Sequence, residues 1–87
     1  GEPTSAPEIS IYPNPASAQL TLQYSGAAGT PATVTVFGMD GRMEKSQPGL
    51  ILNGEMILNI EDIPEGLHLI QLRSENVSLT QKLLIVR

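Results

Sequence analysis

The sequence predicts an all-β domain with an aliphatic core. Short segments of alternating apolar and polar residues recur along the 87 residues, and Gly, Pro and Asn separate them. No segment sustains the 3.6-residue period of an amphipathic helix. The chain is 40% hydrophobic, yet only Tyr12, Tyr24 and Phe37 are aromatic. A chain of this length forms one domain, so these segments should share a single core of Leu, Ile and Val.

The N-terminal part divides into a linker and a first strand. Residues 1–7 are rich in Pro and small polar residues, so we expect a mobile linker there and a folded domain over residues 8–87. Residues 8–12 alternate in polarity and predict a strand. The Pro-Asn-Pro sequence at residues 13–15 should end it in a corner, because proline cannot donate to a β ladder.

Two further strands are expected around a loop of small residues. In residues 18–24, the alternate positions Leu20, Leu22 and Tyr24 form one apolar face. Residues 32–38 continue the same pattern, with valines on one face and threonines on the other. Each strand should therefore bury one face and expose the other.

Turn signals organise the middle of the chain. Asp40-Gly41 predicts a hairpin into a strand at residues 42–47, which the following Pro-Gly pair should end. The next Asn-Gly pair predicts a second hairpin, between residues 50–52 and 55–60.

The last strands are expected at residues 67–74 and 77–87, joined by a tight turn. Seven short strands predict an antiparallel sandwich of two sheets. The cysteine pair and core tryptophan of true immunoglobulin domains are missing. The predicted fold is therefore a seven-stranded antiparallel immunoglobulin-like β-sandwich.

The composition argues against catalysis. The net charge of −4 disfavours nucleic acid and anionic membranes as partners. The single histidine, His68, has no second histidine or cysteine to share a metal, and we expect it to pack at the edge of the core. Turn chemistry explains Asp40, and the acidic pair at residues 61–62 is too small for a calcium site. We predict no catalytic, metal or cofactor-binding residue, and no enzyme activity.

Four stretches, taken in order, carry a resemblance to a known family. They are the Tyr-Pro-Asn-Pro motif of residues 11–16, the strand and hairpin of residues 34–42, the strand within residues 60–72, and residues 82–87. Together they resemble the type A C-terminal sorting domain of the type IX secretion system of Bacteroidetes. His68 stands where that family usually has Tyr. The residues that carry the motifs, structural in the family, are Tyr12, Pro13, Asn14, Pro15, Asp40, Gly41, Gly66 and His68.

The resemblance implies a role in protein export without a cofactor. Such domains are carried by secreted proteins, for example proteases and adhesins. An outer-membrane translocon and its shuttle proteins recognise them, and they transit the periplasm and outer membrane with their cargo. A sortase-like protease then removes them at the cell surface, which would place the cut in residues 1–7. The main alternative is an immunoglobulin-like or fibronectin-like spacer or adhesive module of a surface protein.

The last strand is the candidate recognition element. Its residues are Lys82, Leu83, Leu84, Ile85, Val86 and Arg87. At a sheet edge, its free N–H and C=O groups could pair with a receptor strand or a second copy, and the two terminal charges would oppose self-pairing. The alternative is that the apolar run completes the core. We expect Arg87→Glu to leave stability almost unchanged, because exposed charges contribute little.

Overall fold

The computed structural model describes residues 8–25, 29, 31–51, 54–75 and 77–87, without the side chains of residues 49–51. The linker expected at residues 1–7 lies outside this part. Seven strands form in chain order: β1 (Glu8–Tyr12), β2 (Gln19–Ser25), β3 (Pro31–Gly38), β4 (Met43–Ile51), β5 (Glu55–Asn59), β6 (Gly66–Ser74) and β7 (Ser78–Ile85). The expected all-β class is confirmed.

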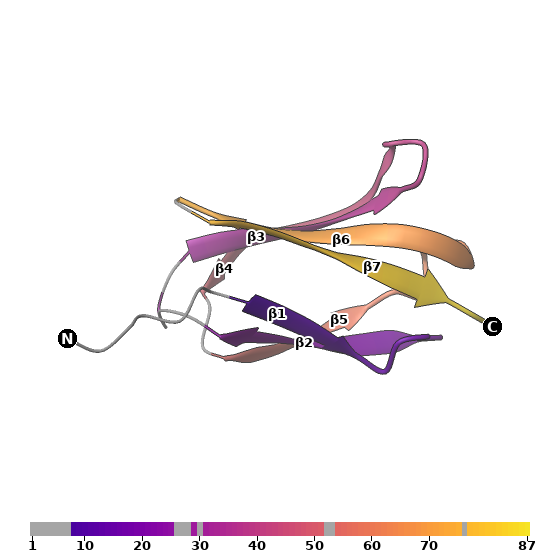
Figure 1. Cartoon of the computed structure of the whole chain (residues 1–87), viewed down its shortest axis with the longest axis horizontal. Coiled ribbons are helices and arrows are strands. Elements are labelled where there is room, and N and C mark those ends of the chain that lie inside the picture. Colours follow the sequence, from indigo (N-terminus) through magenta and orange to yellow (C-terminus); the bar gives the residue numbers. More distant parts are fainter. Residues whose placement is uncertain (1–7, 26–28, 30, 52–53, 76) are drawn as a thin grey trace.

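The strands form two stacked sheets (Figure 1). One sheet has the order β1-β2-β5 and the other the order β4-β3-β6-β7, and every paired strand is antiparallel to its neighbour. This confirms the expected antiparallel arrangement of seven strands in two sheets. β7 is an edge strand, and it lies beside β1, the edge strand of the other sheet.

The core lies between the sheets and is aliphatic, as the composition predicts. Alternation along each strand sends one set of side chains inward, so Leu20, Leu22 and Tyr24 of β2 are buried. The valines of β3 are buried on the facing sheet. Among the described residues, the largest fully buried side chains are Leu20, Leu22, Val34, Val36, Ile60, Ile63, Ile70, Leu72, Leu83 and Ile85.

The predicted Asp40-Gly41 hairpin is present between β3 and β4. Gly41 has φ +86°, a left-handed conformation that favours glycine, and its N–H donates to the carbonyl of Gly38 at 2.9 Å. The carboxylate of Asp40 accepts from the N–H of Arg42 at 3.0 Å, which is the turn role expected of it.

The second predicted hairpin is wrong. Residues 50 and 51 continue β4 and pair with β3, whereas β5 pairs with β2 in the other sheet. The Pro48-Gly49 pair does not end the strand, because the β3–β4 register shifts opposite it and β4 is an edge strand, where proline is tolerated. The Asn-Gly signal therefore marks a crossing between sheets.

Candidate recognition surface at the last strand

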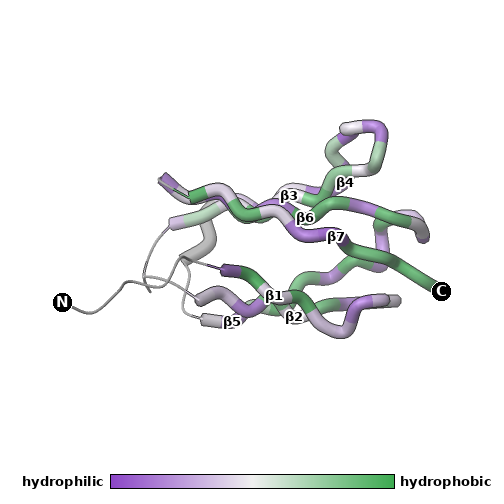
Figure 2. Tube along the Cα trace, in the orientation of Figure 1, coloured by the Kyte–Doolittle hydropathy of each residue, from purple (hydrophilic) through white to green (hydrophobic). Residues whose placement is uncertain are grey.

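β7 is an edge strand whose two faces have different environments. It pairs with β6 from Gly66 opposite Ile85 to Arg73 opposite Ser78. Ile85 is fully buried, as is Leu83, whereas Leu84 is 38% exposed. Figure 2 shows the end of β7 as a continuous hydrophobic stretch. Alternate residues of this apolar run therefore complete the core and the others face outward, and recognition through the strand stays a prediction.

The free edge of β7 is covered over its C-terminal half by the corner that follows β1. The side-chain amide of Asn14 donates to the carbonyl of Lys82 and accepts from the N–H of Leu84, both at 3.1 Å. Ala16 then forms a parallel bridge, its N–H donating to the carbonyl of Leu84 and its carbonyl accepting from the N–H of Val86, both at 2.9 Å.

These contacts restrict how a partner can use the strand. An added strand needs unpaired N–H and C=O groups along an edge. At residues 82–86 the corner already holds the outward carbonyls of Lys82 and Leu84 and the N–H groups of Leu84 and Val86. Pairing there would require the corner to leave.

The N-terminal half of β7 borders an open cavity instead. The cavity has a volume of about 300 Å³ and separates the start of β1 from this part of β7. Its lining residues are Glu8, Ile9, Leu79, Thr80 and Gln81. Among these described lining residues, Glu8 supplies the one titratable group.

Arg87 is anchored to the connection between β5 and β6. Its guanidinium donates to the carbonyl of Ile63 at 2.6 Å and to that of Ile60 at 2.5 Å. Its backbone N–H donates to the carboxylate of Glu65 at 3.1 Å. The premise that Arg87 is a free surface charge is therefore wrong, because this side chain satisfies two backbone carbonyls, and we now expect Arg87→Glu to lower stability.

Lys82 and Leu84 are the residues of β7 in this region that point away from the core. They alternate with buried Leu83 and Ile85, and both are exposed. Among the residues that the structure describes, no carboxylate lies within ion-pair distance of the Lys82 ammonium. These two side chains can contact a partner without any change in the fold.

Tyr12 joins the two outer strands of the smaller sheet. Its hydroxyl donates to Glu55 Oε2 at 2.7 Å, and its side chain is 43% exposed. The hydrogen bond to Glu55 raises the pKa of the Tyr12 phenol above its usual 10.0, with smaller contributions from desolvation and from the carboxylate charge. Tyr12 therefore ties β1 to β5 across β2.

His68 is buried, as the sequence predicts. It is 5% exposed, and its Nε2 donates to the carbonyl of Pro64 at 2.7 Å. Its Nδ1 is also buried and has no hydrogen-bond partner in the described part of the chain. The ring closes the end of the core beside Gly38 and Leu83, its cross-strand neighbours.

The connection between β5 and β6 carries one ion pair. The ammonium of Lys45 lies 3.1 Å from the carboxylate of Asp62. This hydrogen bond, a backbone hydrogen bond and the charges of Lys45 and Arg87 hold the pKa of Asp62 below its usual 3.8. Of the acidic pair at residues 61–62, Asp62 thus pairs with a lysine, whereas the N–H of Glu61 donates to Asn59 Oδ1 at 2.8 Å.

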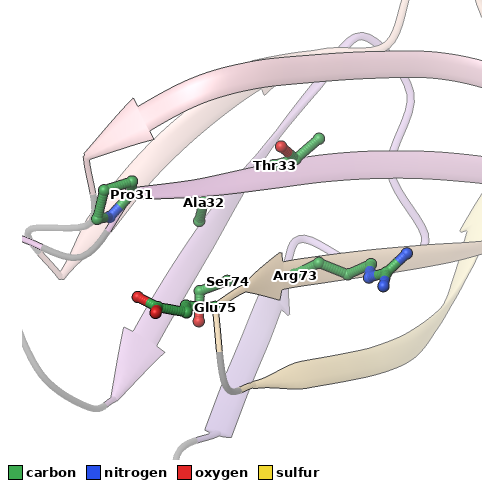
Figure 3. A pocket seen from close by; sticks show the side chains of 6 residues that line it. All are labelled: Pro31, Ala32, Thr33, Arg73, Ser74 and Glu75. Carbon is green, nitrogen blue, oxygen red and sulfur yellow. The ribbon is translucent and has the colours of Figure 1, made fainter.

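A second cavity lies where β3 begins and β6 ends (Figure 3). It has a volume of about 260 Å³ and is lined by Pro31, Ala32, Thr33, Arg73, Ser74 and Glu75. The side chains of Arg73 and Glu75 point in opposite directions, so the charges do not converge. Within the described ranges, no group of three His, Cys, Asp or Glu residues could hold a metal ion.

The comparison with known families identifies the family of this two-sheet domain. A family model described as a secretion system C-terminal sorting domain matches residues 10–86. The chain belongs to this family. It is a sorting signal for type IX secretion, and it marks a protein for export to the cell surface or the medium. No curated protein matches the chain.

In this sorting domain, the first and last motifs meet in space. The Pro-Asn-Pro motif, whose Tyr12–Pro13 and Asn14–Pro15 peptide bonds are both cis, lies along the end of β7. Gly66, at φ +131°, begins the strand that pairs with that end. Sequence reasoning identified these motifs but missed that Asn14 bonds to β7, because a contact across 70 positions leaves no local signal.

The sorting domain has no helix suited to a membrane crossing, in length and apolar character, within the part described.

Proposed function

We propose that this domain is bound by the outer-membrane translocon of the type IX system and its shuttle proteins, and that it does no chemistry itself. The family match over residues 10–86 carries this proposal. The domain crosses with its cargo, and a sortase-like protease at the cell surface cuts in residues 1–7. The Pro-rich, small-residue composition of that segment supports a cleavable linker.

The proposed architecture is immunoglobulin-like. The strand order supports it, because β1, β2 and β5 form one sheet and β4, β3, β6 and β7 the other, with connections that cross between sheets. The corner after β1 adds support, since it leaves the first sheet and pairs in parallel with β7 of the second.

A folded domain presents a fixed surface, which a short peptide does not. Of the residues proposed for recognition, Leu83 and Ile85 support the core and Arg87 holds a loop. Lys82, Leu84 and Val86 remain exposed. We therefore assign contact with the secretion machinery to outward side chains, and a supporting role to the rest of the strand.

A fusion experiment tests the proposed function. A reporter that folds in the periplasm is joined to the C-terminal domain through residues 1–7 and expressed in cells with a type IX system. We expect export and a cut within the linker, located by mass spectrometry of the released reporter. Retention of the reporter in the periplasm, or a cut inside a strand, would contradict the proposal.

The position of the domain separates a sorting signal from a spacer module. The same domain is placed between two reporter domains. A spacer tolerates this position, whereas a C-terminal signal should lose export. Equal export from both positions would favour the spacer.

A further inference from the structure

The outward face of the larger sheet carries an apolar patch with a basic residue. Leu67 of β6 lies opposite Leu84 of β7, and they are 43% and 38% exposed. In the next row, Phe37 lies opposite Leu69, and Leu69 lies opposite Lys82. We name the following residues the outer patch: Phe37, Met43, Leu67, Leu69, Lys82 and Leu84.

The start of β6 reverses the usual polarity of a sheet. A one-sided antiparallel sheet places apolar residues inward and polar residues outward. In β6, however, Leu67 and Leu69 point outward while His68 is buried between the sheets. The reversal costs stability, because the buried Nδ1 of His68 has no partner in the described chain. In β6 the outward Leu67 is exposed and the outward Leu69 is half-buried while a histidine fills the inward position between them, which favours a use for the leucines outside the core.

Three strands of the larger sheet differ from the smaller sheet in the charge of their outward positions. The outward positions of β3, β6 and β7, all described, carry Arg73 and Lys82 and no acidic residue. The fourth strand, β4, adds one acidic and one basic residue. The outward positions of β1, β2 and β5 carry Glu8 and Glu55 and no basic residue. The chain as a whole has a net charge of −4, so the basic character of β3, β6 and β7 is local.

We propose that the outer patch is the surface on which a protein of the secretion machinery docks, and that this protein presents apolar side chains beside a carboxylate that meets Lys82. The inference rests on the proposed function and adds to it the face and the chemistry of the contact. Apolar anchors in the centre of an interface supply most of its affinity, and charges at the rim direct association.

The charge count favours a protein over an anionic lipid surface. Lipid recognition of that kind uses clusters of about four to eight Lys or Arg residues. The outward positions of β3, β6 and β7 provide Arg73 and Lys82. A protein partner needs fewer charges because the apolar contact contributes the affinity.

The test compares matched substitutions on the two faces. The double variant Leu67→Thr/Leu84→Thr removes the patch and keeps β-branched residues on the strands. The control is Ile57→Thr on β5, which is 65% exposed on the outward face of the other sheet. Both variants should keep the thermal unfolding midpoint of the parent, because the side chains are exposed.

Export of the reporter fusion is the first measurement. We expect the double variant to lose about tenfold or more of the export rate, as removal of interface anchors does, and the Ile57→Thr control to match the parent. Lys82→Glu should also reduce export. Parental export of a stably folded double variant would overturn the inference. Failure of the parent fusion to be exported would instead overturn the proposed function.

Two measurements on the purified domain test whether the outer patch instead binds a second copy of the domain or a lipid surface. Sedimentation should give a monomer for parent and double variant alike, and flotation with phosphatidylglycerol vesicles should recover neither. A parent dimer that the double variant breaks would assign the patch to a second copy and overturn the inference. Vesicle binding lost in the double variant would assign it to lipid, with the same consequence.

Discussion

Arg87→Ala should destabilise the domain by about 2 kcal/mol. The guanidinium donates to two backbone carbonyls, those of Ile60 and Ile63, whose side chains are 0% and 1% exposed. A hydrogen bond to a charged group contributes about 1.5–3 kcal/mol, and water at this partly exposed site replaces some of that. A domain of this size has a free energy of unfolding of about 4–13 kcal/mol, so the loss is a large fraction.

Urea and thermal unfolding followed by circular dichroism measure this effect, since the chain has no tryptophan. A loss of about 2 kcal/mol lowers the thermal midpoint by roughly 8–16 °C in a domain of this size. Arg87→Lys keeps the charge but not the planar pair of donors, and should fall between parent and alanine variant.

Arg42→Ala is the matched control. Arg42 is an exposed arginine whose Nε lies 4.0 Å from the Asp40 carboxylate, and such a surface pair contributes roughly 0–1 kcal/mol. If Arg87→Ala and Arg42→Ala had the same unfolding midpoint, the Arg87 guanidinium would not stabilise the loop, and the structural role assigned to it would be refuted.

Three further predictions concern side chains that join distant strands. Asn14→Asp replaces the donor to the β7 edge by a carboxylate and should cost roughly 1–2 kcal/mol in urea unfolding; a parental midpoint would contradict this. Asp62→Asn removes a carboxylate whose pKa lies below 3.8 in the folded state, so the stability that Lys45 provides through it is present at neutral pH and lost as pH falls below about 4. The gap in thermal midpoint between parent and variant should therefore shrink on acidification, and a constant gap would argue against the pair. Tyr12→Phe removes a phenol whose pKa is raised above 10.0, so its contribution is present below pH 10 and lost as pH rises through the folded-state value. Ultraviolet titration of the parent minus the variant should show this raised pKa, and Glu55→Gln should return it toward 10.0.

Much of the fold follows from local patterns. Alternation assigned the inward faces of β2 and β3 correctly, because a period of two leaves one choice of face once a core exists. The hairpin at Asp40-Gly41 was equally local. The hairpin expected at residues 50–60 is wrong because residues 50 and 51 keep pairing with β3, whereas β5 pairs with β2. An Asn-Gly pair can also stand between two strands that belong to different sheets.

The site was less accessible from sequence. The apolar residues after Lys82 could belong either to the core or to a contact surface. The β6–β7 register shows which of them point into the core and which point outward. The anchoring of Arg87 by Ile60 and Ile63 joins positions far apart in the chain. The outward Leu67 and Leu69 follow from the same register, since their composition alone would place leucines inside.

The last strand serves three purposes at once, and this limits what deletion can show. Leu83 and Ile85 fill the core, the backbone of residues 82–86 holds the corner at Asn14, and Arg87 closes a loop. Removing residues 83–87 should abolish export, but it removes core side chains, contacts to the corner and Leu84 of the outer patch together. Substitution of outward side chains leaves the core and the contacts to the corner intact. A loss of export in Leu67→Thr/Leu84→Thr with unchanged unfolding would therefore separate recognition from folding, which truncation cannot do.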